Sequence, residues 1–581
     1  MRVTCAAVVA AVVGALLATP ATAQPAGVAF ADADFSGYAT STVAHLHLVE
    51  QGQLRLENTD AAFTGAAVDS TGLGAAQLNE VKRVVRPAAE GANAGKKTYA
   101  RGSGLEVGLA LNPPSAPGQL NLQGLAQAWA PPTSTQNQVI GPVNVNNLAY
   151  ASTLRGNATA RWTDDSTCVL GTDLSRGFAH VENLQLVGSG GNNEGLTNPL
   201  IGTFAPQNGR AISNSVSRTA LVPQRNAAGQ PIGPNFGLIS QTRQTIAPVT
   251  LFAGTTNETR IEFLGEWVLT VVATGIDGGA YVHYGPGAVN PETLVANIVR
   301  AGQDVVRVRL QQITGNTGLV VPLPSGLGEI AIGEDPRAIG GNAASQPEIA
   351  ADGTSAAAAV DVVRIRLTIP GVEVTDLRIG HMEVRAQVPA GGIACALPVT
   401  KVATPDSVSV GDNFTTTITI NNPYDCDLVG IVVNDEITTT GGARFRVVST
   451  TPTADQVPGG DNLSSGTVRW SLPDPLGPGE QTQVAVTLQA QGSSGRIDDI
   501  ARATGALANC RGEDASVAGT AISAAGAGLV GSSDPVRVPV GAVAPQVLAR
   551  TGPGAWLTML SGLSLLGVSL AGLRASRRRL S

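Results

Sequence analysis

The chain has 581 residues, with 37 basic and 44 acidic side chains and a formal net charge of -7. This balance argues against nucleic-acid binding, which requires basic patches on the protein surface. Hydrophobic residues make up 43% of the chain, enough to form buried cores, while 70 glycines, 35 prolines and few aromatic residues favour short strands and turns over long helices. The length corresponds to about three or four globular units.

The N-terminus has the three-part pattern of a secretory signal peptide. A single charged residue, Arg2, precedes a long apolar run, and the small residues Ala21 and Ala23 form an A-x-A cleavage site. The run is too short to span a bilayer comfortably, and the alternative, a buried N-terminal helix without a polar face, is rare in soluble folds. The sequence therefore predicts a signal peptide over residues 1–23, with cleavage before Gln24.

The cysteines are consistent with export. Once Cys5 leaves with the signal peptide, an even number remains, which predicts two disulfides with three possible pairings. No C-x-x-C pair occurs and the cysteines are far apart in sequence, so a zinc site is not expected. The four cysteines are Cys168, Cys395, Cys426 and Cys510.

Between the two ends the pattern predicts an all-β fold. Apolar and polar residues alternate over short segments that are separated by turns rich in Gly, Pro and Asn. One short segment, residues 291–300, is the best helical candidate. The clearest predicted strands are residues 40–49, 259–274, 304–313, 361–369 and 381–388.

Two of these strands echo each other, with DVVRVRL at residues 304–310 and DVVRIRL at residues 361–367. Both place two arginines on one face. On neighbouring strands the four arginines could hold an anionic wall polymer. The alternative, which we favour, is a solvated sheet face with cross-strand Glu partners.

The residues from 24 to 396 are predicted to form a large β-sandwich-like ectodomain of one or two subdomains. Several short blocks resemble actinobacterial surface proteins of the choice-of-anchor P type. The resemblance implies a shared ectodomain with interchangeable anchors and no known activity. The blocks are ARW at 160–162, TCVLG at 167–171, GHME at 380–383 and VPAGGIAC at 388–395.

Residues 397–523 have the pattern of one immunoglobulin-like β-sandwich, with strands at intervals of about 8–12 residues. The segment resembles the conserved repeat domain of bacterial surface proteins. The matching pieces are Lys401, VGD at 410–412, NNP at 421–423, VND at 433–435, Trp470 and LGPG at 476–479.

This order of strands bears on the cross-links of the module. The loops that hold Cys426 and Cys510 should lie at the same end of such a sandwich, which favours their pairing and leaves Cys168 for Cys395. Some surface modules of this kind carry a Lys–Asn or Lys–Asp amide, which here would need Lys401. With disulfides already available, we do not favour that cross-link.

The C-terminal end predicts a membrane helix with a short motif before it. Residues 555–573 are an apolar segment of about 19 residues, long enough at ~1.5 Å per residue to cross a hydrocarbon core. An Arg-rich tail follows, as expected on the cytoplasmic side of a membrane. The pentapeptide before the helix consists of Leu548, Ala549, Arg550, Thr551 and Gly552.

This order of pentapeptide, apolar helix and Arg tail resembles the sorting signal of Gram-positive surface proteins, in the LAxTG spelling read by class E sortases. The resemblance implies that a sortase thiolate attacks the bond between Thr551 and Gly552 and that the acyl group passes to an amine of the cell-wall precursor. A plain membrane anchor with an accidental motif is the alternative. Residues 548–581 are thus the predicted sorting signal, and residues 524–547 a wall-spanning linker.

No catalytic pattern stands out. The sequence has no nucleophile elbow in the ectodomain, and no phosphate loop or dinucleotide fingerprint. His45 and His47 share a strand face but have no evident third ligand, and the acidic clusters at 32–34 and 164–165 lack the frame of a calcium loop. We therefore expect no metal ion and no cofactor.

The expected function is that of a non-enzymatic protein, exported and anchored to the membrane or cell wall of a Gram-positive bacterium, for adhesion, recognition or structural coverage. Its expected partners are a sortase, the cell-wall precursor, the membrane and an unidentified extracellular ligand. The alternative is a wall-attached hydrolase of polysaccharide or peptidoglycan. Its carboxylates would lie in the N-terminal region, at a spacing set by the fold.

Overall fold

The structure is a computed structural model. The described residues are 26–541 without 52–53, 75–94, 112–118, 146–148, 166, 187–188, 193–194, 198, 204–210, 286–291, 302, 304, 315–318, 333–346, 368–372, 375–376, 511–514, 518–519 and 523–526. The predicted signal peptide and membrane helix lie outside this part of the chain. Within it, no helix is long and apolar enough to cross a membrane.

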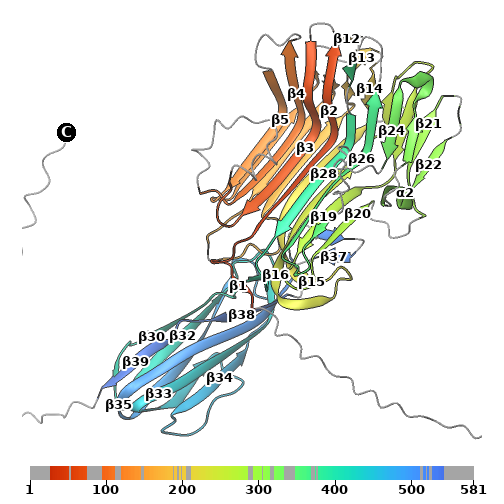
Figure 1. Cartoon of the computed structure of the whole chain (residues 1–581). Coiled ribbons are helices and arrows are strands. Elements are labelled where there is room, and N and C mark those ends of the chain that lie inside the picture. Colours follow the sequence, from red (N-terminus) through yellow and green to blue (C-terminus); the bar gives the residue numbers. More distant parts are fainter. Residues whose placement is uncertain are drawn as a thin grey trace, which may run out of the picture.

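The all-β prediction is confirmed. Among the described residues the helices are the single turn α2 (Leu310–Thr314) and the 3-10 turn η2 (Pro324–Gly326). Figure 1 shows an elongated molecule with a large N-terminal region and a smaller sandwich formed by the C-terminal strands. One continuous hydrophobic cluster extends through both.

The N-terminal region has a ten-stranded sheet as one layer. Its main path runs β23-β24-β26-β28-β2-β3-β4-β5, with β25 beside β26 and β27 beside β2. Its strands are β2 (Ser36–Gln51), β3 (Leu54–Asp69), β4 (Thr98–Leu111), β5 (Gln119–Ala130), β23 (Leu319–Pro322), β24 (Gly328–Ile332), β25 (Glu348–Ile349), β26 (Ser355–Leu367), β27 (Glu373–Val374) and β28 (Leu377–Gln387).

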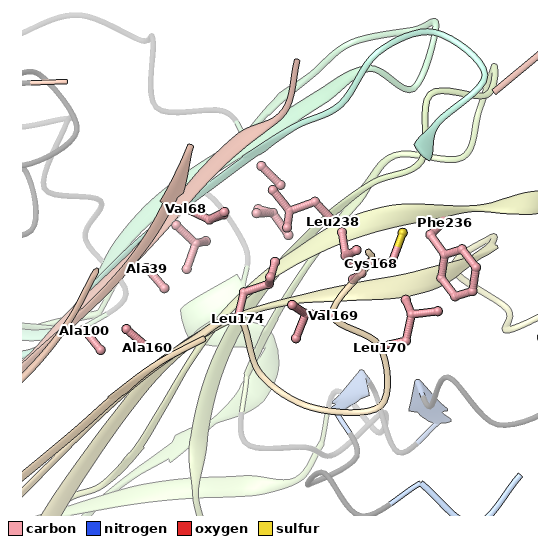
Figure 2. Packing of buried hydrophobic residues seen from close by; sticks show 14 of the residues in the cluster. Ala39, Val68, Ala100, Ala160, Cys168, Val169, Leu170, Leu174, Phe236 and Leu238 are labelled. Carbon is pink, nitrogen blue, oxygen red and sulfur yellow. The ribbon is translucent and has the colours of Figure 1, made fainter. Parts of the chain in front are cut away.

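A nine-stranded sheet packs against it, in the order β1-β29-β16-β15-β10-β9-β6, with β19 and β20 continuing from β16. The parallel pair of β1 and β29 brings the two ends of the region together. The strands are β1 (Val28–Ala29), β6 (Ser134–Ile140), β9 (Thr153–Ala160), β10 (Ser175–Glu182), β15 (Ile212–Arg225), β16 (Pro231–Thr245), β19 (Trp267–Ala273), β20 (Tyr281–Gly285) and β29 (Ile393–Ala394). Figure 2 shows small aliphatic side chains, among them Ala39, Ala100 and Ala160, in the space between strands.

An eight-stranded sheet, ordered β22-β21-β18-β17-β14-β11-β8-β7, and a two-stranded ribbon complete the region. The sheet contains β7 (Val143–Val145), β8 (Ala149–Ala151), β11 (Gln185–Leu186), β14 (Ile201–Thr203), β17 (Val249–Leu251), β18 (Thr259–Phe263), β21 (Leu294–Arg300) and β22 (Val306–Arg309). The ribbon is β12 (Ser189–Asn192) with β13 (Gly195–Thr197).

Three sequence predictions about this region are wrong. The helical candidate at 291–300 is mostly strand β21, because pairing with β18 and β22 overrides its weak helical pattern. The segment 259–274 is two strands, β18 and β19, which belong to different sheets. The echoing strands also lie in different sheets, β22 in the eight-stranded and β26 in the ten-stranded one, so their arginines are not on neighbouring strands.

The C-terminal sandwich is built around two long strands, β33 (Asp427–Thr451) and β35 (Gln481–Ala508), which pair along their whole length. One half of this pair continues into β32 and β30, and the other half is flanked by β34 on one side and β38 and β39 on the other. The pair of β33 and β35 passes from one layer to the other near Gly441 and Gly492. Both residues have positive φ, the conformation that glycine adopts most readily.

The remaining strands of the sandwich correct one domain boundary. The predicted linker 524–547 is wrong over 528–541, where β38 and β39 pair with β35. Within the predicted range 397–523, β36 and β37 pair only with each other and form a separate two-stranded sheet. The bounds are β30 (Val399–Thr404), β31 (Val408–Ser409), β32 (Asn413–Asn421), β34 (Ser465–Ser471), β36 (Ala515–Val517), β37 (Thr520–Ile522), β38 (Gly528–Ser532) and β39 (Val536–Gly541).

Candidate functional site

The predicted processing residues cannot be placed. The sortase pentapeptide at 548–552 and the cleavage residues Ala21, Ala23 and Gln24 lie outside the described residues. The cysteines, histidines and arginines singled out in the sequence fall mostly within them.

The structure joins Cys168 to Cys395 and Cys426 to Cys510, the pairing expected from the sequence. Their Cα atoms are 5.8 Å and 3.9 Å apart, respectively. Disulfides of this kind persist in oxidising, extracytoplasmic compartments. The two disulfides therefore fit an exported protein.

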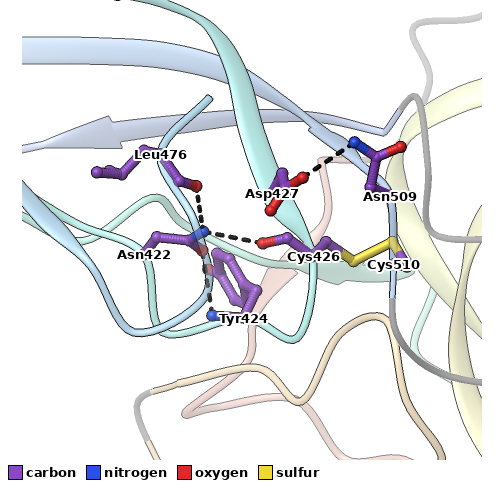
Figure 3. Close-up of a disulfide and its surroundings, with 7 residues drawn as sticks. All are labelled: Asn422, Tyr424, Cys426, Asp427, Leu476, Asn509 and Cys510. Carbon is purple, nitrogen blue, oxygen red and sulfur yellow. Dashed lines mark hydrogen bonds between the residues drawn. A yellow bond between two sulfur atoms is a disulfide. The ribbon is translucent and has the colours of Figure 1, made fainter. Parts of the chain in front are cut away.

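The Cys426–Cys510 disulfide lies where the sandwich meets the N-terminal region. Figure 3 shows the Asn422 side-chain amide donating hydrogen bonds to the carbonyls of Cys426 and Leu476, at 2.9 and 2.8 Å. Gly171 of the N-terminal region packs so closely that an added Cβ would lie 2.2 Å from the Cys426 sulfur. The two regions thus meet at a tightly packed joint.

A hydroxyl group strengthens the same joint. The Tyr424 hydroxyl donates a hydrogen bond of 2.5 Å to the carbonyl of Ala396, at the start of the connection between the two regions. Burial raises the pKa of Tyr424 well above its ordinary value, so the hydroxyl keeps its proton and remains a donor.

His45 and His381 lie in the protein interior, each beside one carboxylate. His45 Nδ1 lies 2.7 Å from Asp60 Oδ1, and His381 Nδ1 lies 2.7 Å from Asp361 Oδ1. The side chain of His47 is outside the described residues. No group of three or more His, Cys, Asp or Glu side chains that could hold a metal ion occurs in the described part of the chain.

The arginines of the echoing strands make individual ion pairs. Arg366 pairs with Glu329, its cross-strand neighbour, at 2.6 Å. Arg309 pairs with Glu292. For Arg366 and Arg309 these partners match the solvated-face alternative, because opposite charges on one sheet face satisfy each other. Arg364 does not match it, because its side chain is buried.

The most unusual chemical group of the described residues lies inside the sandwich. Lys401 on β30 contacts both Asp435 on β33 and Asp499 on β35, and all three side chains are 0% exposed. The Lys401 ammonium donates a hydrogen bond to Asp435 Oδ1. Its contact with Asp499 Oδ1 is an ion pair.

Strand alternation brings these three side chains together. Asp435 lies between the buried Val433 and Ile437, and Asp499 between the buried Ile497 and Ala501. The register pairs Asp435 with Ala501 and Ile437 with Asp499, so the two carboxyls are diagonal neighbours on one inner face. Lys401 reaches them from the facing layer.

Burial and neighbouring charges change the pKa of Asp435 in this group. Burial raises the pKa of Asp435 well above its usual range, the negative charge of Asp499 raises it further, and the Lys401 ammonium opposes both. Asp499 Oδ1 contacts the Lys401 ammonium, while Asp435 Oδ2 and Asp499 Oδ2 make no well-formed hydrogen bond in the described part of the chain. Buried charges with incomplete partners are costly, which makes this a candidate for chemistry rather than for stability alone.

Sequence analysis identified two members of the group, Lys401 and the VND piece that holds Asp435, and missed Asp499. The signal for Asp499 was present. An acidic residue occupies an inward position of an otherwise apolar strand face, which is rare unless the residue has a buried partner.

Comparisons with known proteins give no family. No family model and no curated protein matches the chain. Among solved structures, the chain is similar to the N-terminal domain of a Streptococcus gordonii adhesin, with 9% identity, a TM-score of 0.17, and coverage of 73% of this chain and 86% of that domain.

Two α2-macroglobulins are also similar. A Salmonella mutant protein has 11% identity and a TM-score of 0.16, over 90% of this chain and 39% of its own length. The E. coli protein in its native conformation has 10% identity and a TM-score of 0.15, over 89% and 38%. TM-scores this low carry no conclusion about fold family or function.

Proposed function

We propose that this chain is a non-enzymatic surface protein, exported by its N-terminal signal and held at the membrane or cell wall by its C-terminal segment. Its β ectodomain would serve adhesion, recognition or structural coverage, as the resemblance to choice-of-anchor surface proteins suggests. The observation that carries the proposal is the pair of disulfides, since such cross-links belong to oxidising compartments outside the cytoplasm.

Two close pairs of carboxyls lie where they do not fit the hydrolase alternative. A glycosidase needs two carboxyl groups that face a bound sugar. Asp435 and Asp499 form one close pair of carboxyls, and Glu106 and Asp60 interact electrostatically as another. All four residues are buried, so neither pair can reach a wall polymer without unfolding its surroundings.

Attachment can be tested with one substitution in the pentapeptide. Thr551→Ala removes the residue whose carbonyl a sortase would attack, so wall-linked protein should disappear and the chain should stay with the membrane. Arg550→Ala is the matched control, because the motif leaves that position free. Immunoblots of muramidase-released wall and of membrane fractions, from an actinobacterial host with a class E sortase, measure both.

Two outcomes would decide between the interpretations. Wall linkage of the Thr551→Ala variant equal to that of the parent would overturn the sortase interpretation. Accumulation of the parent in the cytoplasm would overturn export and the surface role with it.

A further inference from the structure

We propose that two copies of this chain pair through β6, antiparallel and around a two-fold axis at Asn137, so that their nine-stranded sheets join into one. The inference goes beyond the surface role and does not depend on it. It is carried by an open, uncharged sheet edge that lacks the protection found at other edges of the molecule.

Strand β6 has a neighbour on one side. It is the last strand of the nine-stranded sheet, and within the described residues it pairs with β9 and with no other strand. The N–H and C=O groups of alternate residues therefore point away from β9, toward the position of a further strand. The residues between Ser134 and Ile140 are all exposed, Val139 to 58%. Such a row of backbone groups is a template for pairing with another chain.

The adjacent edge of the ten-stranded sheet is closed by side chains of β6. The Ser134 hydroxyl accepts a hydrogen bond of 2.9 Å from the N–H of Trp129 on β5 and donates one of 2.6 Å to its carbonyl. Gln136 Oε1 accepts a hydrogen bond of 3.1 Å from the N–H of Gln127. The side chains of β6 thus satisfy backbone groups of β5, while its own outer backbone has no partner in the described part of the chain.

Other edges carry features that prevent strand pairing. At the edge of the eight-stranded sheet, β22 has Arg307 and Arg309, and β23 of the ten-stranded sheet ends with Pro322. In the sandwich, Gln456 bridges to Arg469 and covers the outer side of β34. Charge, proline and a covering segment each discourage an added strand. The sequence of β6, STQNQVI, contains no charge and no proline.

The distribution of charge identifies a second copy as the occupant. The chain has a net charge of -7, so two copies repel each other overall. No charged residue occurs between Glu106 and Arg155, although 14% of the chain is charged, and this stretch contains β5 and β6. Two copies can therefore meet at β6 without bringing like charges together, whereas a charged partner finds no complementary charge on the strand.

The strand is also self-complementary. Around an axis at Asn137, Gln136 lies opposite Gln138, and Thr135 lies opposite Val139. Side-chain amides carry both donors and acceptors, so identical amides can bond across the axis, and Thr and Val favour strands. The pairing uses the open edge of each copy once and thus closes the dimer. One strand is a small contact, so we expect a weak dimer.

A cysteine at the axis tests the contact in the secreted ectodomain. In Asn137→Cys the two new residues would have Cα atoms about 4.5–5.5 Å apart, within the reach of a disulfide. Mild oxidation should therefore give a covalent dimer on a non-reducing gel. Val320→Cys is the control, because Val320 is 58% exposed, as Val139 is, on the protected edge strand β23. Cross-linking of the two variants at equal yield would overturn the proposal.

A charge exchange tests the register. Asn137→Lys and Asn137→Asp each place like charges opposite one another, which destabilises a strand pair. Sedimentation equilibrium should show self-association of each variant at least about tenfold weaker than that of the parent, and a mixture of the two should associate at least as well as the parent. A parent that stays monomeric up to about 1 mM would overturn the dimer. A mixture that associates no better than either variant alone would overturn the axis at Asn137.

Discussion

The N-terminal region and the C-terminal sandwich both stack β-sheets face to face, yet different side chains hold their layers together. In the sandwich, large side chains fill the space between layers, among them Phe414, Phe445 and Trp470, each at most 1% exposed. This is ordinary sheet packing, with layers about 10 Å apart. The N-terminal region departs from it where its ten- and nine-stranded sheets cross.

Glycines bring the backbones of these two sheets into contact. A Cβ on Gly102 of β4 would lie 2.0 Å from the carbonyl oxygen of Phe178, and one on Gly177 of β10 would lie 2.0 Å from that of Arg101. Gly156 of β9 is equally close to the carbonyl of Gly124, at 2.1 Å. None of these three positions has room for a Cβ.

Hydroxyl and amide groups therefore replace aliphatic packing beside the glycines. Thr64 of the ten-stranded sheet makes hydrogen bonds to Ser215 and Ser217 of the nine-stranded sheet, at 2.9 and 2.7 Å. Ser41 bonds to Ser215 at 2.6 Å, and the Gln244 amide donates to Ser41 at 2.6 Å. The comparison teaches that the distance between layers decides whether a β core is apolar or hydrogen-bonded.

The largest expected effect is in the aromatic core of the sandwich. Trp470→Ala should cost about 3–5 kcal/mol of unfolding free energy, because it empties a large buried volume. It also removes the hydrogen bond of 3.0 Å from the indole N–H to the Pro452 carbonyl. Calorimetry of the ectodomain should show a lower transition temperature for the sandwich.

A matched substitution in the other region sharpens the comparison. Trp129 is half-buried in the ten-stranded sheet, where its ring packs at a tilt against that of Tyr99, with centroids 4.1 Å apart. Trp129→Ala should lower the transition of the N-terminal region only. If either variant shifts both transitions equally, the joint at Gly171 makes the two regions one unfolding unit.

The next effect should appear at the glycine crossing. Gly177→Ala adds a methyl group where two carbonyl oxygens, of Arg101 and Gly65, lie 2.0 and 2.7 Å from the new carbon. Backbone cannot move as a flexible side chain can, so we expect a loss of about 3 kcal/mol, at the upper end of overpacking effects. Urea unfolding of the ectodomain, followed by circular dichroism, measures the loss.

Gly141→Ala is the control for this substitution. No atom lies within 4 Å of the added carbon there, and its effect should stay within about 0.5 kcal/mol. Equal stability of the two variants would show that the sheets can separate at little cost, and the contrast between the regions would fail.

Sequence reasoning succeeded where information is local. The spacing of short alternating segments predicted a β-sandwich within residues 397–523, and loop positions in a sandwich predicted the Cys426–Cys510 pair. It failed where a partner far along the chain decides the structure. Residues 528–541 are rich in Gly, Pro and Val and resemble a linker until β35 supplies the hydrogen bonds that make them strands.

The candidate site shows the same limit. Sequence analysis singled out Lys401, but the neighbours of its side chain depend on how the pair of β33 and β35 folds across two layers. Asp435 and Asp499 are 64 residues apart in the printed numbering and become diagonal neighbours only through the register of β33 and β35. No local pattern reports such a register.

The smallest expected effect is the pH dependence that Glu106 gives to the N-terminal region. Glu106 on β4 is fully buried and pairs with Arg101. Burial raises the pKa of Glu106 from its ordinary 4.5 to about 6, Arg101 opposes this shift, and Asp60 adds to it. The folded state therefore holds the Glu106 proton more tightly than the unfolded state does.

The sign of the effect follows from this difference. The stability that comes from the raised pKa is fully present below about pH 4.5 and is lost as the pH rises through about 6, which amounts to about 2 kcal/mol at neutral pH. Glu106→Gln removes the titrating group. Denaturant unfolding between pH 4 and 7 should therefore show the parent losing stability relative to this variant, in the N-terminal transition and not in that of the sandwich. If the unfolding free energies of parent and variant change in parallel across this range, Arg101 keeps Glu106 ionised in the folded protein. The crossing of the two sheets would then tolerate a buried charge pair as well as hydroxyl groups.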